Sequence, residues 1–216
     1  MRITIIGAGG VGQALGASFT RAGHSVTLVG REPEHSREVA EAISARSADS
    51  LGDAVPGADI VVIAVRFPTS GEDLARELAP LVDGKVVVDV TNAPRPDMAG
   101  LLFDAEGSAT ERFAALMPGA RMVKAFNTLM RQRMVDTTED GDPLEGFVAG
   151  DDEAAKAAVM ELVASIGLRP IDAGPMTAAR SLEQLAWLNM SLNRLHGWDW
   201  RTGWRLVGIP AEDADG

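Results

Sequence analysis

The sequence predicts an α/β protein with a doubly wound, mostly parallel sheet and a C-terminal helical extension. Continuous apolar runs of strand length recur along the chain, among them residues 58–65 and 85–90, and such runs are typical of strands buried on both faces of a parallel sheet. Segments with helical patterning separate these runs, and that alternation is typical of doubly wound folds. A glycine-rich turn connects the first apolar run to the first helical segment.

The first strand is expected at residues 2–6, and a G-x-G-x-x-G motif follows it as Gly7, Ala8, Gly9, Gly10, Val11 and Gly12. A strand before this motif and a helix after it form the context that a Rossmann dinucleotide-binding unit requires. Gly7 permits the tight turn, Gly9 lets the backbone approach a pyrophosphate, and Gly12 lets the helix pack close to the sheet. We therefore expect a pyrophosphate at the helix N-terminus. The competing interpretation is an apolar turn without a ligand.

Strands and helices are expected to alternate along the rest of the chain. Further strands are expected at residues 25–29, 45–50, 58–65, 85–90, 121–126, 146–149 and 168–172. Helices are expected at residues 35–43, 70–82, 108–117, 151–166 and 178–196, with a turn or short helix at 51–57. Ser108 or Thr110 is expected to cap the helix that it begins. Residues 94–107 are rich in Pro, Gly and Asp and predict a long loop at the carboxyl end of a strand, where ligands bind in such sheets.

Two parts are expected within one compact unit, a dinucleotide-binding part at residues 1–175 and a helical extension at residues 176–216. Leucines recur at helical spacing between Leu182 and Leu195. This apolar stripe is typical of core packing or of a subunit interface, and we expect a homodimer. Three tryptophans follow it in the tail, as packing anchors or as an aromatic platform, and the sequence leaves both interpretations open. They are Trp198, Trp200 and Trp204.

Composition narrows the class of partner. The net charge of −11 at pH 7 opposes binding to a nucleic-acid backbone. The chain has no cysteine, which excludes disulfides and thiolate chemistry. No histidine stands at metal-ligand spacing from an acidic residue, so we expect no metal site. No segment reaches the roughly 18 to 20 apolar residues that span a bilayer. With no export signal recognised either, we expect a cytoplasmic protein that contacts no membrane.

The end of the second strand indicates which dinucleotide binds. An NAD site carries a carboxylate there for the ribose hydroxyls, but this chain has Gly30 followed by Arg31. A guanidinium is a bidentate partner for a 2'-phosphate, so these residues favour NADP(H). The competing interpretation has Arg31 as a solvated loop residue and Glu32 serving NAD. The residues expected to complete an anion pocket are His35, Ser36 and Arg37.

The nicotinamide ring is expected beyond the carboxyl ends of the strands. The cofactor-binding residues expected there are Ala64, Val65, Arg66, Thr91 and Asn92. The candidates for binding a second substrate are Phe67, Asn127, Thr128 and Trp198. None of these turns supplies an obvious acid or base, and the chain has no tyrosine. Lys124 lies inside a predicted strand, where we expect it to take part in packing or salt bridges. No catalytic residue is therefore assigned. Carbonyl or imine reduction usually needs a proton donor, whereas hydride transfer between two cofactors needs mainly alignment of two rings.

Several of these segments together resemble a known family. They are the glycine motif, Gly30-Arg31, Asp89–Asn92, Val123–Thr128, Gly150–Asp152 and, the most specific of them, Gly167–Pro175. On these residues the chain is similar to the F420H2:NADP oxidoreductases, and it also resembles the cytosolic reductase domain of the STEAP metalloreductases. The resemblance implies hydride transfer between NADPH and the deazaflavin F420, or a flavin, near Phe67, Thr91-Asn92 and Asn127. The candidate partners that it implies for the anionic tail of F420 are Arg66, Arg131, Arg133, Arg201 and Arg205.

Three functions are therefore weighed. The first is an NADP(H)-dependent oxidoreductase whose small-molecule redox partner is F420 or a flavin such as FMN or FAD. The second is an NADPH-dependent reductase of a small organic substrate, an imine or an unsaturated compound, with the Trp-rich tail lining its pocket. The third is an NADP(H)-binding sensor without turnover. A comparison of NADPH oxidation with each kind of acceptor distinguishes them.

Overall fold

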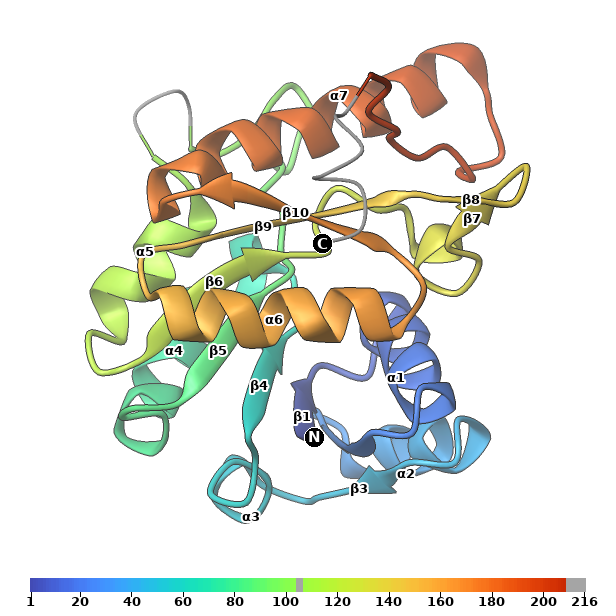
Figure 1. Ribbon diagram of the computed structural model, residues 1–216. Coiled ribbons are helices and arrows are strands. Elements are labelled where there is room, and N and C mark those ends of the chain that lie inside the picture. The colour runs from blue at the N-terminus through green and yellow to red at the C-terminus, as the bar shows by residue number, and fades with distance from the viewer. Residues whose placement is uncertain (104–106, 209–216) are drawn as a thin grey trace.

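The computed structural model describes residues 1–103 and 107–208, and it confirms the predicted fold class. One eight-stranded sheet runs in the order β10-β9-β6-β5-β4-β1-β2-β3, with helices packed against it (Figure 1). Its strands are β1 (Arg2–Ile6), β2 (Ser25–Val29), β3 (Arg46–Ser47), β4 (Ile60–Ile63), β5 (Val86–Asp89), β6 (Arg121–Ala125), β9 (Glu145–Gly150) and β10 (Arg169–Gly174). The α-helices are α1 (Gly10–Arg21), α2 (Pro33–Ala42), α3 (Leu51–Ala54), α4 (Glu72–Leu78), α5 (Ala109–Leu116), α6 (Glu153–Ser165) and α7 (Ala179–His196).

The sheet is mostly parallel, as predicted, and its one reversal lies at β9. Strands β1 to β6 all pair in parallel, whereas β9 is antiparallel to β6 and β10 is parallel to β9. Between β6 and β9 the chain forms the short helix η3 (Arg131–Met134) and a two-stranded ribbon, β7 (Thr138–Glu139) with β8 (Asp142–Pro143). No long helix crosses back over the sheet in this stretch, and a crossover helix is what a parallel continuation usually needs.

Both faces of the sheet are covered by apolar layers, which explains the continuous apolar runs. Side chains of α1, α2 and α6, such as Phe19, Val39 and Val159, form one core with alternate residues of the strands. Side chains of α3, α4 and α5, such as Leu78 and Phe113, form a second core on the other face. A strand between two such cores has no solvated face on which polar residues could alternate.

The expected helix at residues 70–82 is broken into three pieces. They are the π-helical turn η1 (Phe67–Gly71), α4, and the 3-10 turn η2 (Ala79–Leu81). Pro80 lies in the last piece and ends the α-helical pattern because its ring removes an N–H donor. At Gly71 a Cβ atom would lie 2.8 Å from the ring of Phe67, so only glycine permits this close turn.

Helix α5 begins with Ser108 as its N-cap, one of the two predicted caps. The Ser108 hydroxyl accepts a hydrogen bond from the Glu111 backbone N–H at 3.1 Å, and it donates to the Glu111 carboxylate at 2.9 Å. The hydroxyl thereby satisfies one of the backbone donors that the helix start leaves unpaired. The loop predicted before it spans residues 94–107; residues 104–106 of that prediction lie outside the described residues.

Helix α7 crosses the top of the view in Figure 1 and turns a partly polar face toward the sheet. The predicted leucine stripe is only partly buried, because Leu182 is buried but Leu188 and Leu195 are 48% and 76% exposed. Polar residues complete the buried face, among them Asn189 and Asn193. The apolar pattern did not predict the polar part of this face, because the side-chain oxygens of Asn189 and Asn193 accept hydrogen bonds from Thr202 and Trp200 of the tail.

The tail after α7 folds back along that helix. The side-chain oxygen of Asn193 accepts a hydrogen bond from the Trp200 backbone N–H at 3.1 Å, and its amide nitrogen donates to Thr202 at 2.6 Å. Trp204 is half-buried in a small cluster with Phe147 and Leu182, and therefore packs as an anchor. Within the described residues, no helix combines the length and the apolar character that crossing a membrane would require.

Candidate functional site

The glycine motif forms the turn between β1 and α1, and two of its glycines are required by close contact. Gly7 has a φ of +114°, and a Cβ there would lie 2.4 Å from the Ala64 carbonyl oxygen. A Cβ on Gly12 would lie 1.9 Å from the carbonyl oxygen of Gly7. The third glycine, Gly9, has no atom within 4 Å of the position that a Cβ would take. The first two therefore allow strand, turn and helix to pack, and the third leaves open space in front of the helix.

That open space fits the pyrophosphate of a dinucleotide. Gly9 is the N-cap of α1, no side chain caps this end, and no acidic residue lies in the first turn. The backbone N–H groups of the first turn are thus available, and the positive end of the helix favours an anion. The residues present fit the group that the motif predicts.

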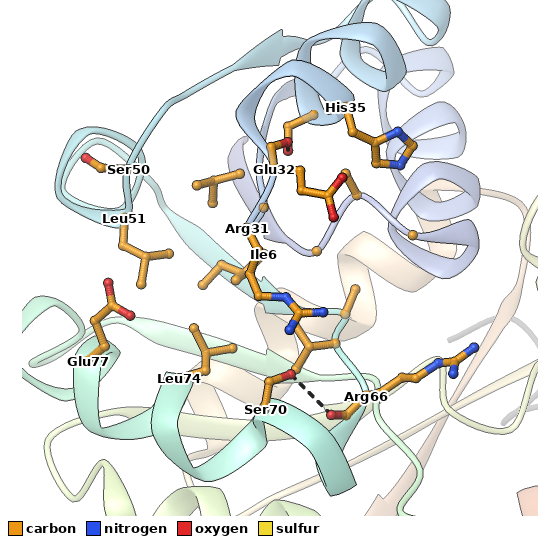
Figure 2. Close-up of a pocket in the computed structure, with 18 of the residues that line it drawn as sticks. Ile6, Arg31, Glu32, His35, Ser50, Leu51, Arg66, Ser70, Leu74 and Glu77 are labelled. Atoms are coloured by element: carbon orange, nitrogen blue, oxygen red, sulfur yellow. Dashed lines mark hydrogen bonds between the residues drawn. The ribbon is translucent and has the colours of Figure 1, made fainter.

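A cavity of about 730 Å³ continues from this turn along the carboxyl ends of β1, β2 and β4. Figure 2 shows its walls: Glu32 and His35 on the α2 side, Leu74 and Glu77 on the α4 side, and the guanidinium of Arg31 extending toward Ser70 between them. Apolar side chains and the Arg31 guanidinium in the same cleft suit an adenosine group that carries a phosphate. The predicted residues that line it are Gly7, Ala8, Gly9, Gly30, Arg31, His35, Ser36, Ala64, Val65 and Arg66.

The cavity contains an unpaired cation at the place where NAD and NADP sites differ. Among the described residues, Arg31 has neither an ion pair nor a side-chain hydrogen bond. Glu32, the residue that would serve NAD, lines the same cavity. Arg37 is not part of this wall, because its guanidinium pairs with Asp49 at 3.2 Å and it lines another hollow toward the amino ends of the strands. Gly30 is required here because a Cβ would lie 2.8 Å from the Ser36 hydroxyl.

The carboxyl ends of β5 and β6 bring two predicted asparagines together. Asn92 donates to the Asn127 backbone oxygen at 2.9 Å, and Asn127 donates to the Asn92 side-chain oxygen at 3.0 Å and to the Leu182 carbonyl at 3.0 Å. The side-chain oxygen of Asn127 and the hydroxyl of Thr91 are buried and have no hydrogen-bond partner among the described residues. Phe126, just before this pair, has a φ of +62°, and such strained backbone clusters at functional sites.

Beneath this pair lies a buried cluster of charges. The Lys124 ammonium donates to Asp89 at 2.9 Å, to Glu183 at 3.0 Å and to the Thr91 carbonyl at 2.5 Å. All three charged side chains are at most 1% exposed. Thr110 adds a hydrogen bond to Asp89 at 2.7 Å. The salt-bridge role expected of Lys124 is what the structure shows, and the cluster ties β5, β6 and α7 together.

Two carboxylates facing one ammonium perturb the proton affinities of the cluster. Burial would lower the pKa of Lys124, but the charges of Asp89 and Glu183 raise it above its ordinary value. Burial raises the pKa of Glu183, since the opposing effect of Lys124 does not compensate for it. Sequence reasoning did not select Glu183, and the signal was present: an acidic residue next to Leu182 on the predicted apolar stripe.

The other candidates for the second substrate lie in different surroundings. Phe67 is buried among aromatic rings, with ring centres 5.2 Å from Phe103 and 5.1 Å from Phe113. The ring of Trp198 stacks on that of His196, with ring centres 4.8 Å apart. His196 ends α7, and Leu182, which accepts a hydrogen bond from Asn127, lies near its start. At a rise of 1.5 Å per residue the two positions are about 20 Å apart along the helix. Thr128 is buried beside Asn127.

Three of the arginines considered for the F420 tail are neutralised within the protein. Arg133 pairs with Asp136 and Glu139, Arg201 pairs with Asp136, and Arg205 pairs with Asp142. The guanidinium groups of the other two, Arg66 and Arg131, form no ion pair with a described residue.

Comparison with known proteins places this fold and site in a class. Residues 2–93 match the family model described as NADP oxidoreductase, coenzyme F420-dependent. The crystal structure of a protein from Arthrobacter sp. FB24, provisionally named an F420-dependent NADP-reductase, is 30% identical and covers 96% of this chain and 99% of its own, with a TM-score of 0.84. A hypothetical protein from Sinorhizobium meliloti, SMa0349, is 32% identical with a TM-score of 0.73, over 83% of this chain and 87% of its own.

The chain therefore has the Rossmann-type fold of the NADP oxidoreductases. It belongs to the family of coenzyme F420-dependent NADP oxidoreductases. Rat metalloreductase STEAP3 is 26% identical over 184 residues, which is 85% of this chain and 36% of that relative. The chain thus spans about a third of the length of the curated relatives that it matches. An imine reductase from Myxococcus stipitatus, 24% identical with a TM-score of 0.66 over 91% of this chain and 62% of its own, shares the fold.

Proposed function

We propose that the protein transfers hydride between NADPH and a deazaflavin or flavin, F420 being the first candidate. In the balanced reaction, NADPH and a proton from solvent convert the oxidised acceptor to its reduced form and leave NADP⁺. The nicotinamide supplies the hydride when bound. The family and the Arthrobacter relative support F420 by name, and the metalloreductase relatives support a redox role in general.

One observation carries the proposal: the polar groups presented where β5 and β6 end are amides rather than acids or bases. Lys124, Asp89 and Glu183 face one another in a closed, buried cluster. The Asn92–Asn127 pair remains, with the buried side-chain oxygen of Asn127 free to accept a hydrogen bond. An acceptor of this kind suits the N–H edge of a planar ring system, and two aligned rings need little else from the protein.

The residues have separate proposed roles along the cleft. The glycine turn, Gly7 to Gly12, holds the pyrophosphate. Arg31 binds the 2'-phosphate, with His35 beside it. Thr91 and Asn92 contact the nicotinamide end. Asn127 orients the second ring. Arg66 leaves the end of β4 with its guanidinium pointing away from Arg31 in Figure 2, so we assign it to the second substrate rather than to the 2'-phosphate.

The test follows NADPH oxidation by stopped-flow absorbance with F420, FMN, FAD and a cyclic imine as separate acceptors. We expect turnover with F420 or a flavin and none with the imine. Reduction of the imine alone would replace the proposal with an organic-substrate reductase. Tight NADPH binding with no oxidation by any acceptor would replace it with the dinucleotide sensor. The variant Asn127→Ala should raise the KM of the active acceptor while the Kd for NADPH stays unchanged.

We also propose a homodimer that uses the exposed side of α7. Leu188 and Leu195 present apolar surface there, and aligned apolar residues on an exposed helix face are typical of subunit contacts. Light scattering should give twice the mass of one chain, and the variant Leu195→Glu should shift it toward the monomer mass. A monomer in the unmodified protein would contradict this proposal.

A further inference from the structure

A second guanidinium lies directly over the first turn of α1. A Cβ atom built on Gly10 would lie 2.8 Å from Cδ and 2.9 Å from Nη1 of Arg131. Gly10 is a variable position of the G-x-G-x-x-G motif, so the turn itself does not demand a glycine there. The glycine at this position leaves room for the Arg131 side chain to cross the helix N-terminus.

The backbone around Arg131 is held in place against α1. Arg131 begins η3, and the Ser18 hydroxyl of α1 donates to the Met134 carbonyl at 2.6 Å. One turn further, Arg21 donates to the Val135 carbonyl at 3.2 Å. Met134 is 2% exposed. Helix η3 therefore lies alongside α1 with its first residue at the end of α1 where the glycine turn lies.

The Arg131 guanidinium lacks a partner where most arginines of this acidic protein have one. Arg2, Arg112 and Arg121 each pair with a carboxylate. Among the described residues, no carboxylate lies within ion-pair distance of Arg131 and no group accepts a hydrogen bond from it. In a chain of net charge −11, an exposed, unpaired guanidinium on an anchored backbone, beside open backbone N–H groups, suits an anion.

We propose that Arg131 is a ligand of the dinucleotide pyrophosphate, closing over it from the side opposite the glycine turn. Open space at Gly9 and the uncapped start of α1 supply one side of this phosphate site, and the Arg131 guanidinium supplies the other. The inference rests on the dinucleotide-binding half of the proposed function. It assigns Arg131 to NADPH, whereas the family resemblance had suggested the anionic tail of the second substrate.

The test is direct binding, measured by titration calorimetry with NADPH and with NADH. Because the pyrophosphate is common to both, Arg131→Gln should raise both Kd values by the same factor, about 10-fold to 100-fold for a charge-assisted hydrogen bond. Arg31→Ala should instead raise mainly the Kd for NADPH. The charge-matched control is Arg46→Gln, since Arg46 bonds Ser25 at the opposite end of β2, and it should change neither Kd.

A double-mutant cycle tests the geometry. Gly10→Ala places a methyl group where the Arg131 side chain lies, and that side chain can swing away without cost to the fold. Gly10→Ala should therefore weaken NADPH binding more in the unmodified protein than in the Arg131→Gln background. Arg131→Lys keeps the charge without the planar fork of donors. Its Kd for NADPH should therefore lie between that of the unmodified protein and that of Arg131→Gln.

Three results would overturn the inference. An unchanged Kd for both dinucleotides is the first, and a loss confined to NADPH, which would place Arg131 at the 2'-phosphate, is the second. The third is an equal rise of both Kd values for the control Arg46→Gln, which would show that the loss is not specific to Arg131. Thermal unfolding checks that each variant is folded. Since binding is measured without an acceptor, failure of the proposed hydride transfer does not affect these results.

Discussion

Arg31 is the side chain that we propose to distinguish the two nicotinamide dinucleotides in this cleft. It stands where an NAD site would carry an acid, it extends into the cavity, and no described carboxylate neutralises it. Glu32 beside it would repel a 2'-phosphate. Since the guanidinium offers two donors in the geometry of a phosphate, we expect its attraction to outweigh the neighbouring acid.

Replacement of Arg31 tests this balance. Arg31→Ala should lower the NADPH preference, expressed as the ratio of the NADH Kd to the NADPH Kd, by about 10-fold or more. Titration calorimetry with both dinucleotides measures it. Glu32→Gln is the matched control and should raise the same preference, because it removes the repulsion. An unchanged ratio in Arg31→Ala would show that the 2'-phosphate binds elsewhere.

Glu183 links the buried charge cluster to the pH dependence of stability. Burial raises its pKa in the folded protein above the ordinary glutamate value of 4.5. Between that value and the raised one, the folded state binds more protons than the unfolded state. The contribution of Glu183 is therefore fully present below about pH 4.5 and is lost as the pH rises through the folded pKa.

The variant Glu183→Gln should remove this pH dependence. The amide oxygen still accepts from Lys124 and from the Ala109 N–H, which now contact the carboxylate at 3.0 and 2.9 Å. The difference in unfolding free energy between variant and unmodified protein should grow in favour of the variant as the pH rises, by at most about 1.4 kcal/mol per pH unit for one proton. Urea unfolding at a series of pH values measures it. The control is Glu161→Gln, at an exposed position of α6, for which the difference in unfolding free energy should not change with pH. A difference that also stayed constant for Glu183→Gln would mean that Glu183 is ionised at every pH tested.

At the scale of elements, the start of α1 separates packing from binding within one motif. Gly12 and Gly7 lie so close that a Cβ on Gly12 would meet a backbone oxygen at 1.9 Å, which no side-chain movement relieves. Gly9 faces open space, with a φ of −74° that any residue adopts. We therefore expect Gly12 to serve the fold and Gly9 to serve the ligand within the same fingerprint.

A pair of alanine variants should show this separation. Gly12→Ala should lower the unfolding free energy by roughly 1–3 kcal/mol, the usual cost of overpacking. Gly9→Ala should leave stability within about 0.5 kcal/mol and raise the NADPH Kd by 10-fold or more, because its methyl group occupies the phosphate space. Denaturant unfolding and NADPH titration on both variants provide the comparison. Equal losses of stability would contradict the assignment.

The same scale shows what could be predicted from the sequence and why. Strands such as β4 and β5, and the Ser108 cap of α5, follow from local patterns, and their positions were predicted closely. The reversal at β9, the polar face of α7 and the placement of Arg131 over Gly10 depend on partners far along the chain. Local patterning carries no information on such pairs, so Glu183 was missed although Lys124 was interpreted correctly.

For the whole molecule, the acidic net charge and the two proposed guanidinium contacts act on NADPH in opposite directions. The charge of −11 repels the dinucleotide at long range. On our proposals, Arg31 and Arg131 attract it at contact distance. At about 0.1 M salt the Debye length is about 10 Å, so the long-range repulsion is already largely screened, whereas the contacts are not.

Raising the salt concentration should therefore weaken binding. Between about 0.1 M and 1 M the Debye length falls from about 10 to 3 Å, which reaches the range of the guanidinium contacts. The NADPH Kd should rise several-fold over this range, and the double variant Arg31→Ala/Arg131→Gln should show a much shallower rise because both contacts are gone. Fluorescence titration of NADPH at several potassium chloride concentrations measures both slopes. Binding that tightens with salt would mean that repulsion by the acidic surface, rather than attraction by the cleft, dominates the electrostatics of this site.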